Sequence, residues 1–164
     1  MAYFEDLSAY SYTDVDTIEM DWGWLQLRPG YDRINVGWLD ASRAFEQGPT
    51  PTWFAGALLD IIVVPRINTM RGYHRCQFCP ARSDGSMLSV GHASGAILLG
   101  HTEIRVPAGP GRMFAAPSLI WHYVTAHSYR PPTEFIEAVG RYDHGWASEP
   151  SPWIPPTAER ITFD

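Results

Sequence analysis

Hydrophobic and polar residues alternate along several short stretches of this chain, which is the pattern of strands with one buried face. Residues 17–28 alternate with a change of phase near Gly23, which we interpret as a β-bulge, and residues 33–40 alternate again. Because the intervening sequence RPGYD is rich in turn formers, it predicts a hairpin between these two stretches. Residues 102–107 and 112–117 flank the sequence AGPG and predict a second hairpin.

Three other stretches carry hydrophobic residues at helical spacing. The first covers residues 48–63, with Thr50 as its predicted N-cap and Pro51 in its first turn. Residues 116–129, with Ser118 near the start, predict the second helix, and residues 130–142, with Thr133 in the first turn and Gly140 as the stop, predict the third. Since strands and helices are interspersed without a regular βαβ rhythm, we expect an α+β fold with a mainly antiparallel sheet and about three short helices.

The size of the chain fits one domain with a substantial core. It has 164 residues, of which 45% are hydrophobic. We predict a single domain over residues 1–164, in which the Pro- and Trp-rich residues 145–164 pack on the rest as an extended C-terminal segment. Tryptophan side chains favour such packing because full solvation of their rings is unfavourable.

Charge and hydropathy exclude several classes of partner. The net charge is −6 and no basic run occurs, so nucleic acid is not expected as the main ligand. The longest hydrophobic run, AGALLDIIVV, is interrupted by Asp60, and the first residues lack the basic and hydrophobic regions of a signal peptide. We therefore expect a cytoplasmic protein that binds no membrane, in a reducing compartment that disfavours a structural disulfide. The sequence does not indicate an oligomeric state.

Both cysteines of the chain lie in the segment RGYHRCQFCP with a C-x2-C spacing. Two thiolates on one tight turn suit a tetrahedral metal ion, which needs two further Cys or His ligands. Among the six histidines, one pair on a predicted helix has the H-x4-H spacing that occurs in Cys2His2 zinc sites. We predict one zinc ion that clips a loop to a helix and stabilises the domain. Its predicted ligands are Cys76, Cys79, His122 and His127, with His74 as the substitute ligand.

Two explanations without a bound metal stay open. The cysteines can be small buried hydrophobic residues, and the two histidines can be packed helix residues with hydrogen bonds. A C-x2-C pair is also a redox motif, but the strand–CxxC–helix context of thioredoxin-like proteins is missing here.

A catalytic zinc would need an open coordination position and a general base close by. The candidate bases are Glu103, in the sequence HTE, and His92, in a glycine-flanked loop where solvation is expected. HTE and CQFCP resemble the H-x-E and P-C-x2-C of zinc deaminases, but here H-x-E follows the cysteines and the proline lies after them. Alternation with Ile104 and Val106 instead predicts that Glu103 and Arg105 line the solvent face of a strand, with an Arg–Glu pair directed into a pocket as the alternative.

An acidic group lies near the start of the first alternating stretch. Its members are Asp14, Asp16, Glu19 and Asp21. They lack the central glycine and terminal glutamate of an EF-hand loop, so we expect a solvated acidic face rather than a calcium site.

The chain resembles a family of small uncharacterised bacterial proteins. The resemblance rests on YFEDLSAYSY at residues 3–12, VGWLD at 36–40, HRCQFC at 74–79 and HYVTAHSYRPP at 122–132. It covers most of residues 3–140 and implies no known activity. It does imply that the predicted zinc ligands belong to a recurring pattern, which favours metal binding.

These features predict a small zinc-binding protein in which the metal is structural and which binds a protein partner, for example as a toxin-neutralising immunity protein. The alternative is a metal-dependent hydrolase or other small-molecule enzyme with one open zinc position. Four protein ligands would favour the structural role, and three plus a water would favour catalysis. A ligand-binding module without metal is a third hypothesis, and it should fold normally in a strong chelator.

Overall fold

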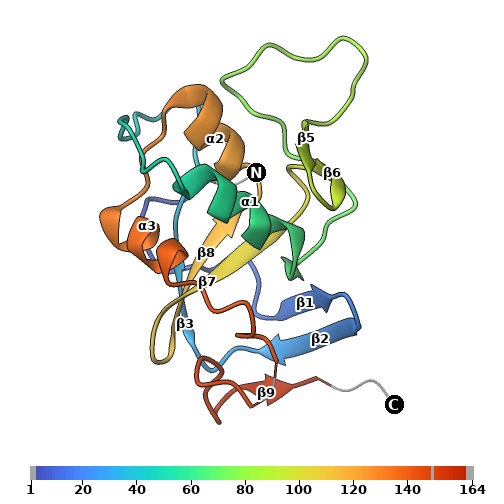
Figure 1. Ribbon diagram of the computed structural model, residues 1–164, viewed down its shortest axis with the longest axis vertical. Coiled ribbons are helices and arrows are strands. Elements are labelled where there is room, and N and C mark those ends of the chain that lie inside the picture. The colour runs from blue at the N-terminus through green and yellow to red at the C-terminus, as the bar shows by residue number, and fades with distance from the viewer. Residues whose placement is uncertain (1–2, 149, 162–164) are drawn as a thin grey trace.

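The computed structural model describes residues 3–148 and 150–161, which form nine strands and three short helices (Figure 1). The helices are α1 (Phe54–Val63), α2 (Ile120–His127) and α3 (Thr133–Gly140). The strands are β1 (Asp16–Met20), β2 (Gly23–Arg28), β3 (Asp32–Asn35), β4 (Arg66–Ile67), β5 (Ser89–His92), β6 (Gly95–Leu98), β7 (Glu103–Gly109), β8 (Arg112–Pro117) and β9 (Glu159–Arg160). The predicted α+β class is confirmed.

Seven of the strands form one sheet in the order β3-β8-β7-β4-β1-β2-β9. Only the β3–β8 pair in this sheet of described residues is parallel, so the sheet is mainly antiparallel as predicted. The predicted second hairpin is confirmed as β7–β8, in which Ile104 pairs with Ala116. β5 and β6 form a separate two-stranded hairpin.

The first predicted hairpin, around RPGYD, is wrong. β1 and β2 pair with each other, and Met20 faces Gly23 across a two-residue turn, so the change of phase near Gly23 marks a turn and not a bulge. β3 pairs in parallel with β8, with Ile34 opposite Phe114. The alternation shows which face of a strand is buried, but it carries no information about a partner strand this far along the chain.

The main core lies between the helices and one face of β7. Ile104 and Val106 of β7 are fully buried in the same cluster as Phe54 and Leu58 of α1 and Phe135 of α3. α1 begins later than predicted and has no side-chain cap from Thr50, because Trp53 occupies the N-cap position and the N–H of Phe54 bonds to the Pro51 carbonyl. With ten residues in α1 and eight in each of the others, no described helix could cross a membrane.

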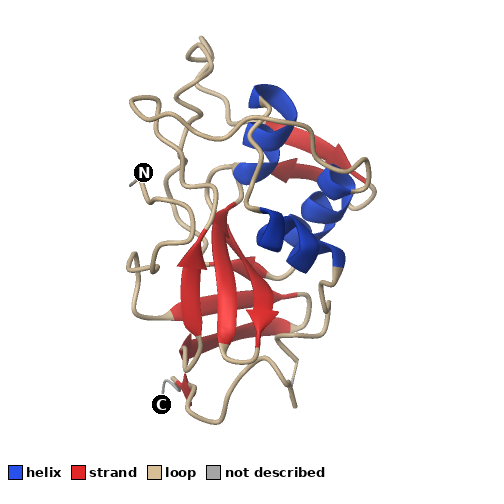
Figure 2. Ribbon diagram, turned by 90° about the vertical axis from the view of Figure 1, so that its left-hand side faces the viewer, coloured by secondary structure: helices blue, strands red, loops and turns tan. Residues whose placement is uncertain are grey.

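The other face of β7 is covered by the chain itself. β1 and β2 run crosswise to β7 and β8 below the helices (Figures 1 and 2). This arrangement lets Asp16 of β1 reach Arg105 of β7, with an Oδ1–Nη2 distance of 2.7 Å. β7 therefore lies between two covering layers and has no solvent-exposed face in its first five residues.

The C-terminal segment contributes tryptophan side chains to a second hydrophobic cluster. Trp146 is fully buried, and Trp153 packs against the cluster that also contains Ile18 and Met113. β9 pairs with β2 through the pair Leu27–Arg160 and forms one edge of the sheet. Residues 149 and 162–164 of the predicted segment lie outside the described residues.

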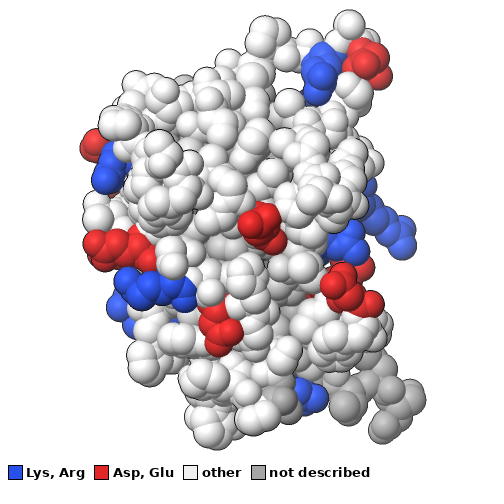
Figure 3. Space-filling view, in the orientation of Figure 1, with Lys and Arg blue, Asp and Glu red and all other residues white. Residues whose placement is uncertain are grey.

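Charged side chains are scattered over one face of the molecule. On the face seen in Figure 3, acidic and basic side chains are scattered singly or in small mixed groups, without a broad basic patch. Several large hydrophobic side chains are exposed, among them Trp22 at 71%, Tyr73 and Trp53. Single exposed hydrophobic side chains are ordinary on a protein surface, and only a contiguous patch of them marks a contact site.

Candidate metal centre

Four side chains from a loop and a helix bring one ligand atom each into a single cluster. The cluster consists of Cys76, Cys79, His122 and His127, and these atoms all lie within 4.8 Å of one another. The Nε2 atom of His127 lies 3.3 Å from the sulfur of each cysteine. The Nε2 atom of His122 lies 3.3 Å from the sulfur of Cys79. The structure thus brings together all four residues predicted as metal ligands.

The spacing of these atoms suits a small tetrahedral cation. Zinc binds thiolate sulfur at about 2.3 Å and imidazole nitrogen at about 2.0–2.1 Å, so its ligand atoms lie roughly 3.4–3.8 Å apart. The three S···N separations of 3.3 Å are close to these tetrahedral edges. Two Cys and two His also form a ligand set typical of structural zinc sites. The same distances suit hydrogen bonds between thiols and imidazoles, which is the metal-free explanation.

Aromatic packing holds the cysteine turn against α2. Phe78 lies between the two cysteines in sequence, and its ring centroid is 5.4 Å from that of His127 and 5.9 Å from that of Tyr123. Phe45 closes the other side at 5.2 Å. The contacts of Phe78 with Tyr123 and Phe45 are edge-to-face and the one with His127 is tilted, and this packing positions the thiols beside the helix without help from an ion.

The way in which α2 ends brings its two histidines together. On an ideal helix the side chains of His122 and His127 would point about 140° apart. His127 is the last residue of the helix, and Ser128 turns the chain away in the left-handed conformation with φ of 58°. The N–H groups of Ser128 and Tyr129 both donate to the Tyr123 carbonyl, and Gln47 donates to the His127 carbonyl. The two imidazole centroids lie 5.0 Å apart as a result.

Burial shifts the pKa of two members of this cluster, Cys76 and His122. It raises the pKa of the Cys76 thiol, and the Cys79 side chain raises it further, although donation from the N–H groups of Phe78 and Cys79 lowers it. Burial also lowers the pKa of His122, as does the positive charge that His127 can carry. Both groups therefore favour their neutral forms unless a cation is bound. Neutral imidazole can ligate a metal directly, whereas the thiol must first lose a proton, which a bound divalent cation favours.

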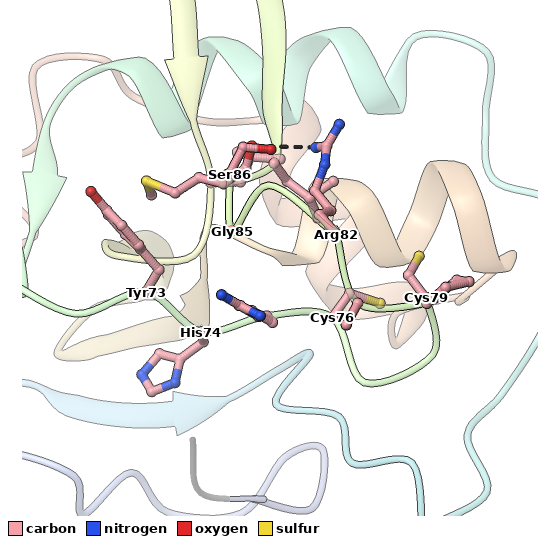
Figure 4. A pocket seen from close by; sticks show the side chains of 13 residues that line it. Tyr73, His74, Cys76, Cys79, Arg82, Gly85 and Ser86 are labelled. Atoms are coloured by element: carbon pink, nitrogen blue, oxygen red, sulfur yellow. Dashed lines mark hydrogen bonds between the residues drawn. The ribbon is translucent and has the colours of Figure 1, made fainter.

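The substitute ligand His74 lies outside the cluster. Its side chain points away from the two sulfur atoms (Figure 4). Its backbone N–H donates to the Gly100 carbonyl at 2.7 Å, which joins the cysteine segment to the chain before β7. Burial lowers the pKa of His74, so its imidazole favours the neutral form.

Gly100 is required at this junction. Its φ is +103°, and a Cβ atom added there would lie 2.4 Å from the His74 carbonyl oxygen. We expect Gly100→Ala to lower the free energy of unfolding by about 2–4 kcal/mol, because both the strained backbone and the steric overlap oppose it. Urea denaturation measures the effect, with Gly72→Ala as the control, since a Cβ at Gly72 meets nothing within 4 Å. Equal midpoints for the two variants would contradict this account.

The predicted solvent exposure of Glu103 is wrong, because both faces of β7 are covered. Three donors occupy its carboxylate: the Tyr10 hydroxyl at 2.7 Å, Asn68 Nδ2 at 2.8 Å and Arg105 Nη2 at 2.9 Å. Glu103 does not belong to the Cys–His cluster. The structure therefore gives it a place in a buried hydrogen-bond network instead of one beside the metal ligands.

The sequence predicts that His92 is a solvated loop residue, and this prediction is wrong. It ends β5 and is half-buried, and its Nε2 lies 2.7 Å from Asp60 Oδ1 on α1. The N–H of Ser94 donates to His92 Nδ1 at 3.0 Å, so this nitrogen is an acceptor and Nε2 donates to Asp60. The contact fastens the β5–β6 hairpin to α1, and His92 does not belong to the Cys–His cluster.

A buried ionic network that the sequence patterns do not predict has Asp16 and Arg105 at its centre. Asp16 is fully buried rather than part of a solvated acidic face, and it accepts from Arg105 Nε at 3.0 Å, from Arg33 Nη1 at 3.0 Å and from the Tyr31 hydroxyl at 2.9 Å. One signal was present in the sequence, because Asp16 lies in phase with the buried Ile18 of the same strand. Asp14 and Asp21, by contrast, are exposed as predicted.

The fold and the cluster define the class of protein as a small α+β protein with a possible metal centre between a loop and a helix. The chain belongs to the family described as Domain of unknown function (DUF7919), which matches residues 2–140. This match confirms the predicted membership in an uncharacterised family and includes all four residues of the cluster. No curated protein and no solved structure gave a significant match.

Proposed function

We propose that this protein binds one zinc ion as a structural element that fastens the Cys76–Cys79 turn to the end of α2. The observation that carries the proposal is the convergence of two sulfur and two imidazole nitrogen atoms within 4.8 Å. Four protein ligands would fill a tetrahedral site and leave no position for water or substrate. The ion would thereby close a long loop of the chain, which stabilises the folded state.

The enzyme alternative finds less support. A metal-dependent hydrolase needs an open zinc position and a general base within hydrogen-bond reach of the reacting group. Glu103 already accepts from three donors of the buried network, and His92 is engaged with Asp60 and Ser94. Neither candidate base belongs to the Cys–His cluster.

As a zinc-stabilised module, the protein acts in the cytoplasm by binding a protein partner, in the manner of an immunity protein. Support comes from its small size, its net charge of −6 and its exposed aromatic side chains such as Trp22 and Tyr73. Aromatic residues commonly anchor protein interfaces, and an acidic surface favours a basic partner. The scattered charges in Figure 3 give no support to nucleic-acid binding.

Metal content is the direct test. Elemental analysis of the purified protein is expected to give one zinc per chain, and His127→Ala is expected to lower that content. Replacement by Co²⁺ should give the absorption of a tetrahedral site with two thiolates. A protein that is purified and refolded with zinc yet retains none would overturn the proposal. Full zinc content and an unchanged Co²⁺ spectrum in His127→Ala would instead favour three protein ligands and the enzyme alternative.

A further inference from the structure

A small cavity lies beside the cysteine turn. The loop of residues 80–88 folds back over residues 73–79 and encloses about 50 Å³ (Figure 4). Both cysteines line this cavity, and Met87, Leu88 and the buried Leu99 contribute hydrophobic side chains to its wall. One water molecule needs about 10–15 Å³ by the same measure, so the cavity admits a molecule of a few atoms and no large substrate.

The two cysteines differ in their exposure. Cys76 is buried, with 7% of its surface exposed, whereas Cys79 is half-buried. A small molecule in the cavity has both residues in its wall, and Cys79 is the more accessible of the two. Because oxidation of cysteine by peroxides follows the exposure of the sulfur, Cys79 is the expected first target of a small oxidant.

Metal binding and a disulfide are mutually exclusive states of this pair. The ligand atoms of the cluster lie within 4.8 Å of one another, so the two sulfur atoms are already close, and a disulfide needs a distance of about 2 Å between them. C-x2-C is also the spacing of redox-active dithiols. Zinc is bound by thiolates, and the sulfur atoms of a disulfide no longer carry that charge. The turn therefore holds either the ion or the S–S bond.

We propose that Cys76 and Cys79 form a peroxide-sensitive switch that releases the metal, with a hydroperoxide as the oxidant. The Cys79 sulfur attacks the O–O bond of the peroxide, which breaks as an S–O bond forms and hydroxide leaves. The Cys76 sulfur then attacks the Cys79 sulfur, so that the S–S bond forms, the S–O bond breaks and a second hydroxide leaves. Two thiolates and one H₂O₂ thus give one disulfide and two hydroxide ions, and two electrons pass from sulfur to oxygen.

Release of the ion opens the connection between the cysteine turn and α2. The two imidazoles remain, but two of the four ligands are lost. The new disulfide closes a loop of only four residues, whereas the metal joins Cys79 to His122 across 43 positions. Since the stabilisation by a cross-link grows with the length of the loop, the oxidised form is less stable than the zinc form. This inference rests on the proposed function, because the same structural ion is the one that oxidation removes.

Treatment of the full-length zinc-loaded protein with H₂O₂ tests the proposal, with an untreated sample as the baseline. About one zinc ion per chain should be released to a chromogenic chelator, together with a mass loss of about 2 Da for one disulfide. Dithiothreitol and added zinc should restore the original zinc content. When dimedone is present during oxidation, peptide mass spectrometry should find its adduct on Cys79 and not on Cys76.

Three variants test the route of the oxidant. Leu88→Trp fills the cavity and should slow zinc release about threefold or more, because it reduces access to the sulfur atoms. Leu98→Trp is the matched control, since Leu98 is exposed and does not line the cavity, and it should release zinc at the wild-type rate. Met87→Leu removes an oxidisable side chain from the wall and should also leave the rate unchanged. Zinc content before oxidation shows whether each variant keeps its metal centre. An equal rate in Leu88→Trp and the wild type would overturn the cavity as the route.

Three further results would overturn the switch itself. The first is retention of zinc while Met87 is oxidised. The second is release of zinc with sulfinic acid on either cysteine in place of a disulfide, and the third is release that dithiothreitol and zinc do not reverse. These outcomes are distinct from failure of the proposed function. Zinc-loaded protein that keeps its ion in peroxide would refute the switch alone, whereas protein refolded with zinc that retains none would refute the metal centre and the switch together.

Discussion

Loss of the metal is expected to destabilise the protein severely, and Cys79→Ser should reproduce the effect of a strong chelator. Cys79 contacts both histidines of the cluster, so its replacement removes two of the three contacts between sulfur and imidazole nitrogen. An ion present at a thousandfold excess over its dissociation constant stabilises the folded state by about 4 kcal/mol. For a chain of this size that loss lowers the thermal midpoint by roughly 10 °C. Thermal unfolding followed by circular dichroism, before and after chelation, measures it.

His144→Ala is the control for this experiment, because His144 is exposed and lies outside the cluster. Its midpoint should remain within about 2 °C of the wild type, as expected for a surface substitution. The chelated wild type should recover its midpoint when zinc is returned, whereas Cys79→Ser should not. A wild-type midpoint that is unchanged by a strong chelator would instead support the metal-free module.

The candidate metal cluster was predictable because its information is local and chemically restricted. The C-x2-C turn and the H-x4-H helix each lie within six residues, and few residue types other than Cys and His form such sites. The weaker part of the prediction was His74 as the substitute ligand, which was chosen because it lies near the cysteines in sequence. In the structure its side chain points away from both sulfur atoms and it is not a member of the cluster (Figure 4). Proximity in sequence does not determine the direction of a side chain.

Pairing of distant strands was not predictable from the same patterns. The hairpin β7–β8 was found because its turn is short and rich in glycine and proline. The sequence pattern pairs β3 with its neighbour β2, but in the structure it pairs with β8, eighty residues away, as the pair Ile34–Phe114 shows. The alternation of hydrophobic and polar residues in β3 is compatible with any partner strand that buries the same face, so it does not identify β8.

The exposure of Glu103 and Arg105 was mispredicted for a related reason. Alternation with Ile104 and Val106 separates two faces of β7, but it does not show that the polar face meets water. Here that face meets β1, whose Asp16 lies 89 positions from Arg105 in the sequence. A buried charge is tolerated when it is paired and hydrogen-bonded, and the tertiary fold supplies those partners.

Arg105→Met should lower the free energy of unfolding by about 3–5 kcal/mol, the usual cost of removing one partner from a buried ion pair. Arg105 donates to Asp16 through two nitrogen atoms and to Glu103 through one. Methionine keeps much of the side-chain volume but leaves two buried carboxylates with Arg33 as the nearest remaining cation of the network. Urea denaturation at pH 7 measures the loss. Arg66→Met is the matched control, because Arg66 forms an exposed pair with Glu19, and it should change stability by less than about 1 kcal/mol.

The dependence on pH distinguishes lost ion pairing from lost packing in Arg105→Met. Burial alone would raise the pKa of Asp16, but the charge and hydrogen bonds of Arg105, with help from Arg33 and Tyr31, lower it to about 2. Since this pKa is lower in the folded state than in the unfolded state, Asp16 contributes about 2 kcal/mol near neutral pH. That contribution disappears as the pH falls from about 4 towards 2. In Arg105→Met burial dominates and raises the pKa of Asp16, so protonation becomes favourable at a higher pH. The stability gap between wild type and variant should therefore narrow between pH 7 and pH 3, whereas a gap that stays constant over this range would mean that the arginine acts through packing alone.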